Sequence, residues 1–329
     1  MIEIDGSIGE GGGQVLRTAL SVACVLQKPV RVFNIRKGRD PPGLKAQHLA
    51  VCRLLASIAN GKMNGAEMGS TEIIFEPGEI MGGEYAFDIG TAGSCTLLLQ
   101  AALPVLLHAK KESAIAITGG THVRAAPTFD YFAEVFLPAA RKFGVSEECR
   151  VKMIRAGFYP KGGGSVELCV TPSKLRGAAL QPQKNEHVLY SIVSSGLPPH
   201  VAKREEEKLK EMLAGRNIGG KISAENAMSP GNAVTLWSEC IGASSLGEIG
   251  KPAEKVADEA CEKFLSEEKG GNVDSHLADQ LLLYAALADG KSSYYTGKFT
   301  THLTTNAAVL SAMTGRNIIL GEEGKIEVV

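Results

Sequence analysis

The order of glycine-rich, helical and strand-like segments constrains the fold of this chain more than any other feature. Three stretches, residues 13–60, 93–144 and 277–320, each read as a helix, a strand, a loop, a second helix and a short continuation. Within each stretch, the second helix starts 29, 34 or 25 residues after the first, counted from Gly13 to Pro42, from Gly93 to Pro127 and from Leu277 to His302. Because helices and strands alternate at similar spacing, we expect three related α/β units, although no residue-level repeat accompanies the pattern.

Residues 184–273 follow a different pattern. Two amphipathic helices at 201–215 and 253–268 flank a pair of strands at 233–240 and 244–250. We therefore predict an α/β (α+β) fold in which three βαβαββ-like units form a large domain, residues 1–183 plus 274–329, with a small inserted α+β domain at 184–273. A plain tandem of two domains is the alternative, but the third unit alone is too short to bury a core.

Composition excludes several classes of protein. The chain has 329 residues, of which 38 are glycines without a Gly-x-y period, so it is not collagen-like. Its 44% hydrophobic content excludes a disordered chain, and 35 basic against 36 acidic residues exclude a strongly basic nucleic-acid packaging protein. No apolar run is long enough for a membrane span, and the start of the chain is not a secretory signal. Seven scattered cysteines without a CxxC pair are typical of buried thiols, so we expect a cytoplasmic protein.

A glycine-rich segment, residues 6–13, comes directly before the first helical pattern. Glycines let backbone N–H groups approach an anion, and the start of a helix adds a favourable dipole. No Gly-Lys-Ser/Thr follows, so the segment is not a P-loop. A tight strand-to-helix turn without a ligand is an equally good interpretation. Glu10, within this segment, is either a carboxylate for a divalent cation or a solvated loop acid.

Positive charge concentrates in residues 28–53, where seven Lys or Arg residues face one acid, Asp40. That local charge of +6 contrasts with the net charge of −1 for the chain. Arginines in a loop beside a glycine-rich turn are able to converge on phosphates, which favours a phosphate site. A solvated basic face is the alternative. The cationic residues are Lys28, Arg31, Arg36, Lys37, Arg39, Lys45 and Arg53.

Among the seven histidines, His302 stands out. It follows a strand and begins a helix among four threonines and Asn306, in the sequence TTHLTTN, and hydroxyl-rich surroundings can fix an imidazole tautomer. A capping or surface role is the alternative. The segment HLADQ at 276–280 is a helix start where Asp279 would be favoured without any function. No His or Cys spacing fits a zinc site.

Several motifs in one order resemble those of the RNA 3′-terminal phosphate cyclases. They are DGSIGEGGGQVLR, IRKGRDPPGLKAQHL, GTAGSCTLLLQ, GFYPKGGG, HLADQ and HLTTN, which together span essentially the whole chain. The resemblance implies repeated α/β units similar to those of enolpyruvyl transferases, with a small inserted domain. It also implies a ligase-type nucleotidyl transfer that uses ATP and Mg²⁺ or Mn²⁺ to convert an RNA 3′-phosphate into a 2′,3′-cyclic phosphate.

The resemblance further implies roles for individual residues. His302 matches the nucleophile that carries AMP, and Glu10 matches a metal-binding carboxylate. His276 and Pro127 match residues that sandwich adenine, although several relatives have an aromatic residue at the position of His276. The other matched ATP contacts are Gln100, Leu277, Ala278, Asp279 and Gln280. The matched residues for the RNA end or for phosphate are Arg17, Arg36, Arg39 and Gln47.

Two other functions stay open at this level. A related group of non-catalytic RNA-binding proteins, which act in ribosomal RNA processing, shares the fold but lacks the nucleophilic histidine. Enolpyruvyl transferases contain similar units but usually six of them. The retained His302 favours the cyclase, whose partner would be an RNA with a 3′-phosphate end, without a membrane. An isologous homodimer is compatible with the chain.

Overall fold

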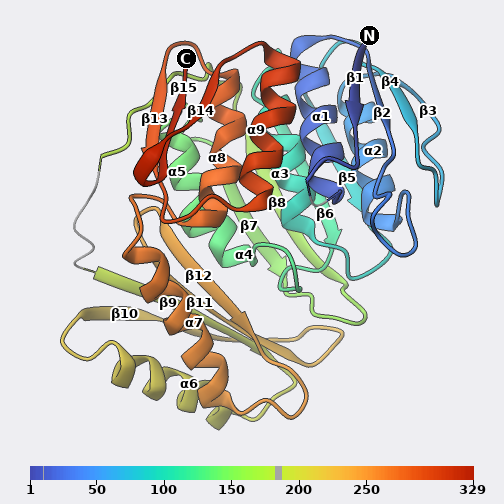
Figure 1. Cartoon of the computed structure of the whole chain (residues 1–329). Helices are drawn as coiled ribbons and strands as arrows, with labels where there is room; N and C mark the ends of the chain where they lie inside the picture. The colour runs from blue at the N-terminus through green and yellow to red at the C-terminus, as the bar shows by residue number, and fades with distance from the viewer. Residues whose placement is uncertain (10, 182–186) are drawn as a thin grey trace.

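The computed structural model describes residues 1–9, 11–181 and 187–329. It is a mixed α/β structure, which confirms the predicted fold class. A larger body carries both termini, and a smaller body made of one sheet and two helices lies beside it (Figure 1). In the part of the chain that the structure describes, no helix is both long and apolar enough to cross a membrane.

The first sheet of the larger body has the strand order β1-β2-β4-β3. β1 and β2 are parallel, and the other two pairs are antiparallel. The elements are β1 (Ile2–Asp5), α1 (Gly13–Leu26), β2 (Val30–Phe33), α2 (Ala46–Ile58), β3 (Lys62–Asn64) and β4 (Ile73–Glu76). Alternation of buried and half-exposed residues along β2 places one of its faces in the core.

The second sheet has the corresponding order, β5-β6-β8-β7. Its strands are β5 (Glu84–Asp88), β6 (Ser113–Gly119), β7 (Arg150–Arg155) and β8 (Gly164–Val170), and α3 (Cys95–Leu106) follows β5. The helix predicted after Pro127 consists of three short pieces, α4 (Phe129–Tyr131), the π-helical η1 (Phe132–Phe136) and α5 (Leu137–Arg141). Pro138 explains this, because it has no N–H for the preceding turn and its ring displaces that turn.

The third sheet contains β13 (Ser292–Tyr295), β15 (Lys325–Val328) and β14 (Ile318–Leu320), in that order. The helices α8 (Ser275–Leu287) and α9 (Thr301–Thr314) accompany it, and a 3₁₀ turn, η2 (Glu322–Gly324), precedes β15. Arg176 and Ala179 form isolated parallel bridges to Asp289 and Ser293. This segment lies where the other two sheets have their first strand, so the third group of elements begins near residue 176, before the start at Leu277 that the sequence indicates.

The smaller body is built on the sheet β10-β9-β11-β12. Its elements are β9 (His187–Ser195), α6 (Pro199–Met212), β10 (Asn217–Glu225), β11 (Gly231–Ser238), β12 (Ile241–Leu246) and α7 (Ala253–Glu268). α6 and α7 cover one face of the sheet (Figure 1), and Leu236 and Phe264 are fully buried between these layers. The sequence predicted strands at 233–240 and 244–250 in this region, and β9 and β10 are two further strands. The residue boundaries of the two predicted domains stay predictions.

The helices form the centre of the larger body, where α1 packs against α3 and α9, and α9 packs against α8. The N-terminal ends of α1, α3, α8 and α9 lie at the edge of this body that faces the β9–β12 sheet (Figure 1). Helix N-termini carry unpaired N–H groups and a partial positive charge. The edge between the two bodies is therefore suited to bind an anionic ligand.

Candidate active site

A cavity of about 750 Å³ lies at the edge between the two bodies. The larger body contributes side chains from α1, α3, α8 and α9, and the smaller body contributes residues of β12 and α7. Residues that are far apart in the sequence thus share one pocket. The predicted site residues that line it are Arg17, Gln100, Pro127, His276, Asp279, Gln280 and His302.

His302 lies in the first turn of α9, which Thr300 caps by accepting a hydrogen bond from Leu303 N. Its Nδ1 lies 2.6 Å from Gln14 Oε1, and Gln14 Nε2 donates to Asp279 Oδ2 at 2.9 Å. An ionised carboxylate only accepts hydrogen bonds, so the amide nitrogen of Gln14 must face Asp279 and its oxygen must face His302. Nδ1 therefore carries a proton in this arrangement, and a neutral imidazole of this tautomer would have its lone pair on Nε2.

Buried hydrogen bonds hold α1, α8 and α9 in place around His302, Gln14 and Asp279. Thr18 Oγ1 donates to Asn306 Oδ1 at 2.8 Å, and Asn306 Nδ2 donates to the backbone oxygen of Asp279 at 2.9 Å. All three residues are buried. Because such a network is rigid when all its members are paired, it fixes the distance between His302 and Asp279.

The start of α8 depends on Asp274, which is fully buried. Its carboxylate accepts hydrogen bonds from His276 N and Leu277 N, from the Tyr131 hydroxyl and from Gly242 N of the smaller body. Burial raises the pKa of Asp274 to about 7. This residue joins the two bodies where the cavity opens, and it directs the first turn of α8 into the cavity.

Two faces of α8 have different surroundings. His276, Asp279 and Gln280 line the cavity, and Gln280 Oε1 accepts a hydrogen bond from Gln100 Nε2 at 2.7 Å. Leu277 and Ala278 are fully buried in the hydrophobic core, and their side chains do not line the cavity. The structure thus brings three residues of the HLADQ motif to the site and leaves two side chains in the core.

His276 and Pro127 both line the cavity, from α8 and from the segment before α4. Desolvation by the surrounding protein lowers the pKa of His276, while the nearby Glu267 carboxylate opposes this shift. Glu267 accepts hydrogen bonds from the backbone N and the hydroxyl of Ser275, at 2.8 and 2.6 Å. The His276 ring is therefore a predominantly neutral surface at pH 7, suited to stack on a flat ligand.

The start of α1 forms a positively charged corner of the site. Arg17 lines the cavity, and burial lowers its pKa to about 10 while Asp279 opposes the shift. Burial, together with Arg17, Arg36 and Lys45, lowers the pKa of His48 to about 4. His48 Nδ1 accepts a hydrogen bond from Lys45 N at 3.0 Å, and a methyl group at Gly13 would collide with His48 Nε2. Only a glycine allows this approach.

The other residues predicted to contact phosphate lie beside this corner and do not line the cavity. Arg36 is buried, has a positive φ of 53°, and donates to the backbone oxygens of Pro41 and Gly43. Arg39 reaches the start of α1, since its Nη2 lies 4.0 Å from where a Cβ on Gly12 would be. Gln47 Oε1 accepts a hydrogen bond from Ser94 N at 3.1 Å.

Glu10, the predicted metal ligand, lies outside the described residues. Among residues 1–9, 11–181 and 187–329, no three His, Cys, Asp or Glu side chains gather in a group that could hold a metal ion.

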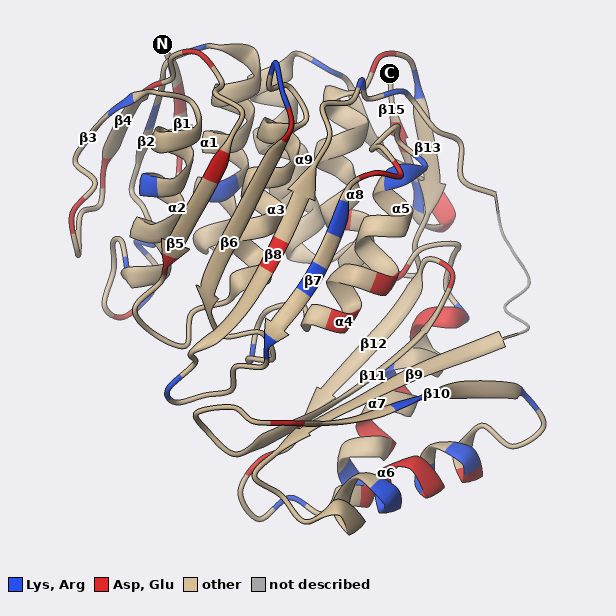
Figure 2. Ribbon diagram, turned by 180° about the vertical axis from the view of Figure 1, so that it is seen from behind, with Lys and Arg blue, Asp and Glu red and all other residues tan. Residues whose placement is uncertain are grey.

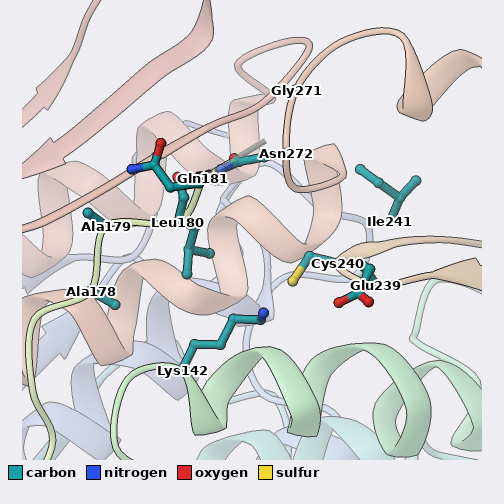
Figure 3. Close-up of a pocket in the computed structure, with 10 residues that line it drawn as sticks. All are labelled: Lys142, Ala178, Ala179, Leu180, Gln181, Glu239, Cys240, Ile241, Gly271 and Asn272. Carbon is teal, nitrogen blue, oxygen red and sulfur yellow. Dashed lines mark hydrogen bonds between the residues drawn. The ribbon is translucent and has the colours of Figure 1, made fainter. Parts of the chain in front are cut away.

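A second cavity, of about 320 Å³, lies between α5, the segment 178–181 and the β11–β12 turn. Lys142, Glu239 and Cys240 lie around it (Figure 3). None of the residues predicted to bind ATP or RNA lines this cavity. The larger cavity is therefore the candidate active site.

Gln14, Asp274 and His48 are not among the residues that the sequence singled out. Gln14 follows Gly13 at the start of a helix, and its partner Asp279 lies 265 residues further on. No local pattern marks such a pair. For His48, its position within the basic segment 28–53 was the available signal.

The fold and the cavity define the class of this protein as a mixed α/β protein with a histidine-containing cavity between its two bodies. A family model described as RNA 3′-terminal phosphate cyclase matches residues 8–320. The chain belongs to this family.

Relatives with the name RNA 3′-terminal phosphate cyclase match the chain over nearly their whole length. The one from Archaeoglobus fulgidus is 44% identical over 329 residues, covering 99% of each chain. The one from Methanosarcina barkeri is 45% identical and covers 93% of this chain and 92% of the relative. The one from Pyrococcus furiosus is 40% identical and covers 100% and 99%. Among solved structures, the enolpyruvyl transferase NikO from Streptomyces tendae has a TM-score of 0.43 at 12% identity, covering 99% of this chain and 47% of that one.

Proposed function

We propose that this chain is an ATP-dependent RNA 3′-terminal phosphate cyclase that works through a covalent histidine–AMP intermediate. The observation that carries the proposal is the position of His302 in the cavity, with its tautomer set by Gln14 and Asp279. The family and the names of its relatives support the overall reaction.

In the first step, His302 Nε2 attacks the α-phosphorus of ATP. A P–N bond forms, the bond to the bridging oxygen breaks, and pyrophosphate leaves. A neutral imidazole does this at pH 7 without prior loss of a proton from Nε2, whereas a lysine would first have to be deprotonated. The proton stays on Nδ1 and keeps its hydrogen bond to Gln14 Oε1, so the Gln14–Asp279 pair stabilises the positive charge that develops on the ring.

In the later steps, an oxygen of the RNA 3′-phosphate attacks the AMP phosphorus and displaces His302. The resulting anhydride is then attacked by the adjacent 2′-hydroxyl, which forms the 2′,3′-cyclic phosphodiester and releases AMP and one proton. Proximity of the hydroxyl supplies much of the rate. In this proposal Arg17 and the start of α1 hold phosphate charge, and Arg36, Arg39 and Gln47 position the RNA end.

The base of ATP would lie between His276 and Pro127, with Gln100, Asp279 and Gln280 beside it. For Leu277 and Ala278, we propose that the backbone faces the ligand, since their side chains are buried in the core. Mg²⁺ or Mn²⁺ would be held by Glu10 and by phosphate oxygens, since Mg²⁺ commonly takes one or two carboxylates plus substrate phosphates. It would neutralise charge on the triphosphate.

An end-protection assay tests the proposed reaction. An RNA carrying a ³²P-labelled 3′-phosphate is incubated with protein, ATP and Mg²⁺ or Mn²⁺, and then treated with phosphatase. We expect the label to become phosphatase-resistant only when ATP is present. If the label stays fully removable with both metals, the chain is not a cyclase, and the alternative of a non-catalytic RNA-binding protein in ribosomal RNA processing takes its place.

A further inference from the structure

The loop that joins β7 to β8, Gly157–Gly164, carries the GFYPKGGG motif but has no part in the chemistry proposed above. It is a tight turn, in which Gly162 N donates to the backbone oxygen of Phe158 at 2.8 Å. It lies at the end of its sheet that faces the smaller body (Figure 2). We call it the platform loop.

The platform loop is fixed to both bodies. Phe158 is buried and stacks on His122, with ring centroids 5.4 Å apart. Lys161 N donates to Ser229 Oγ, at the start of β11, at 3.2 Å. Arg155 Nε donates to the backbone oxygen of Gly163 at 2.6 Å. These contacts hold the loop in one conformation, so the side chains at its tip are presented in a fixed place.

At that tip, Tyr159 exposes 77% of its surface. Lys161 and Arg155 are exposed next to it, and Lys152 is exposed on β7, an edge strand whose basic residues appear blue in Figure 2. An exposed ring on a fixed turn contributes little to folding. An aromatic ring flanked by cations is the combination that binds single-stranded nucleic acid, by base stacking and by phosphate neutralisation.

The platform loop is connected, through neighbouring segments, to the positively charged corner at the start of α1. Gly162 packs on the backbone of Thr91 and Ala92, where a Cβ would lie 2.8 Å from Ala92 Cα, so a glycine is required there. The next residues along that segment contact Gln47, whose Oε1 accepts the hydrogen bond from Ser94 N. A strand whose 3′ end reaches Gln47 and the start of α1 therefore passes over this segment toward Tyr159.

We propose that the platform loop binds the single-stranded RNA immediately upstream of the 3′ end, with Tyr159 stacked on a base and Lys161 and Arg155 against phosphates. This inference rests on the proposed function for the direction of the strand. It concerns binding, and none of the three residues takes part in the transfer of AMP.

Fluorescence anisotropy with a 5′-labelled, 3′-phosphorylated single-stranded RNA of roughly ten nucleotides tests the proposal. We expect Tyr159→Ala to weaken binding by about fivefold or more, and Tyr159→Trp to restore it. Lys161→Gln should reduce the slope of log Kd against log salt concentration by about 0.7. Ile319→Ala and Lys291→Gln change exposed residues of the β13–β15 region and should bind like wild type.

A second substrate separates binding at the platform loop from a general defect. In this proposal, a 3′-phosphorylated dinucleotide would end before it reaches Tyr159, so we expect Tyr159→Ala to cyclise it at the wild-type rate. The proposal would be overturned if Tyr159→Ala bound the long RNA with wild-type affinity. It would also be overturned if the substitution slowed cyclisation of both substrates equally. If wild type binds the long RNA but never cyclises either substrate, the proposed function fails, while the anisotropy series still reports on the loop.

Discussion

In the proposed mechanism, the amide group of Gln14 decides which nitrogen of His302 attacks ATP. Its oxygen faces His302 Nδ1 at 2.6 Å, and its nitrogen donates to Asp279. Without that hydrogen bond, the imidazole would rotate or carry its proton on Nε2, where it would block attack. We therefore propose that Gln14 is a positioning residue that acts through His302.

Gln14→Ala should slow the formation of the protein–AMP adduct by about 10- to 100-fold, because a fraction of the imidazole then has the wrong tautomer or orientation. The pH profile of adduct formation should also change, while affinity for the 3′-phosphorylated RNA stays at the wild-type value. Rapid-quench experiments with labelled ATP over a range of pH measure the rate and the pH profile of adduct formation. A rate and profile equal to wild type would show that Gln14 does not position His302.

His48 makes stability depend on pH in a defined direction. Its pKa of about 4 in the folded protein lies below the ordinary value, so between pH 6.5 and 4 the unfolded chain binds a proton that the folded protein does not. Stability is then lost as the pH falls. We expect the free energy of unfolding of wild type to fall by about 3 kcal/mol relative to His48→Gln between pH 7 and pH 4. Urea denaturation of both proteins measures the difference, and a constant difference would contradict the shift.

At the scale of elements, the first turn of α8 presents the predicted residues selectively. Residues 276, 279 and 280 are spaced i, i+3 and i+4, so they share one face of the helix, while 277 and 278 turn toward the core. The motif could be recognised from the sequence. Which of its five side chains face the ligand depends on the packing of α8 against its neighbours.

Asp274→Ala should destabilise the protein by about 2–4 kcal/mol. The substitution removes the cap of α8 and leaves the buried Tyr131 hydroxyl and Gly242 N without their acceptor. The matched control is Asp289→Ala, whose carboxylate is 73% exposed and pairs with Lys174 at the surface, where we expect a change within about 0.5 kcal/mol. Equal effects of the two substitutions in chemical denaturation would rule out the capping role.

At the scale of the whole molecule, the cavity exists only because the two bodies meet. The sequence allowed the fold class, the core helices α1 and α9 and seven of the residues that line the cavity to be predicted, since apolar periodicity and motifs are local. It did not allow β9, β10 or the origin of the third sheet near Arg176 to be predicted. An isolated bridge has no periodic signal, and pairing across long stretches of chain is set by packing.

Because both bodies line the cavity, ATP should stabilise them together. At an ATP concentration of about 100 times Kd, the gain is about 2.7 kcal/mol, seen as a rise in Tm. Ser266→Trp, on the cavity side of α7, should abolish most of that rise, and Lys255→Trp, at an exposed position of α7 that does not line the cavity, should keep it. An undiminished rise with Ser266→Trp would place ATP elsewhere.

The proposed mechanism requires His302 to carry AMP, and incubation with ATP labelled on the α-phosphate, in Mg²⁺ or Mn²⁺ and without RNA, measures this step. We expect one labelled, acid-labile protein adduct that maps to the peptide containing His302, disappears in His302→Ala and is discharged by RNA with a 3′-phosphate. No adduct in the wild-type protein, or an equal adduct in His302→Ala, would contradict it.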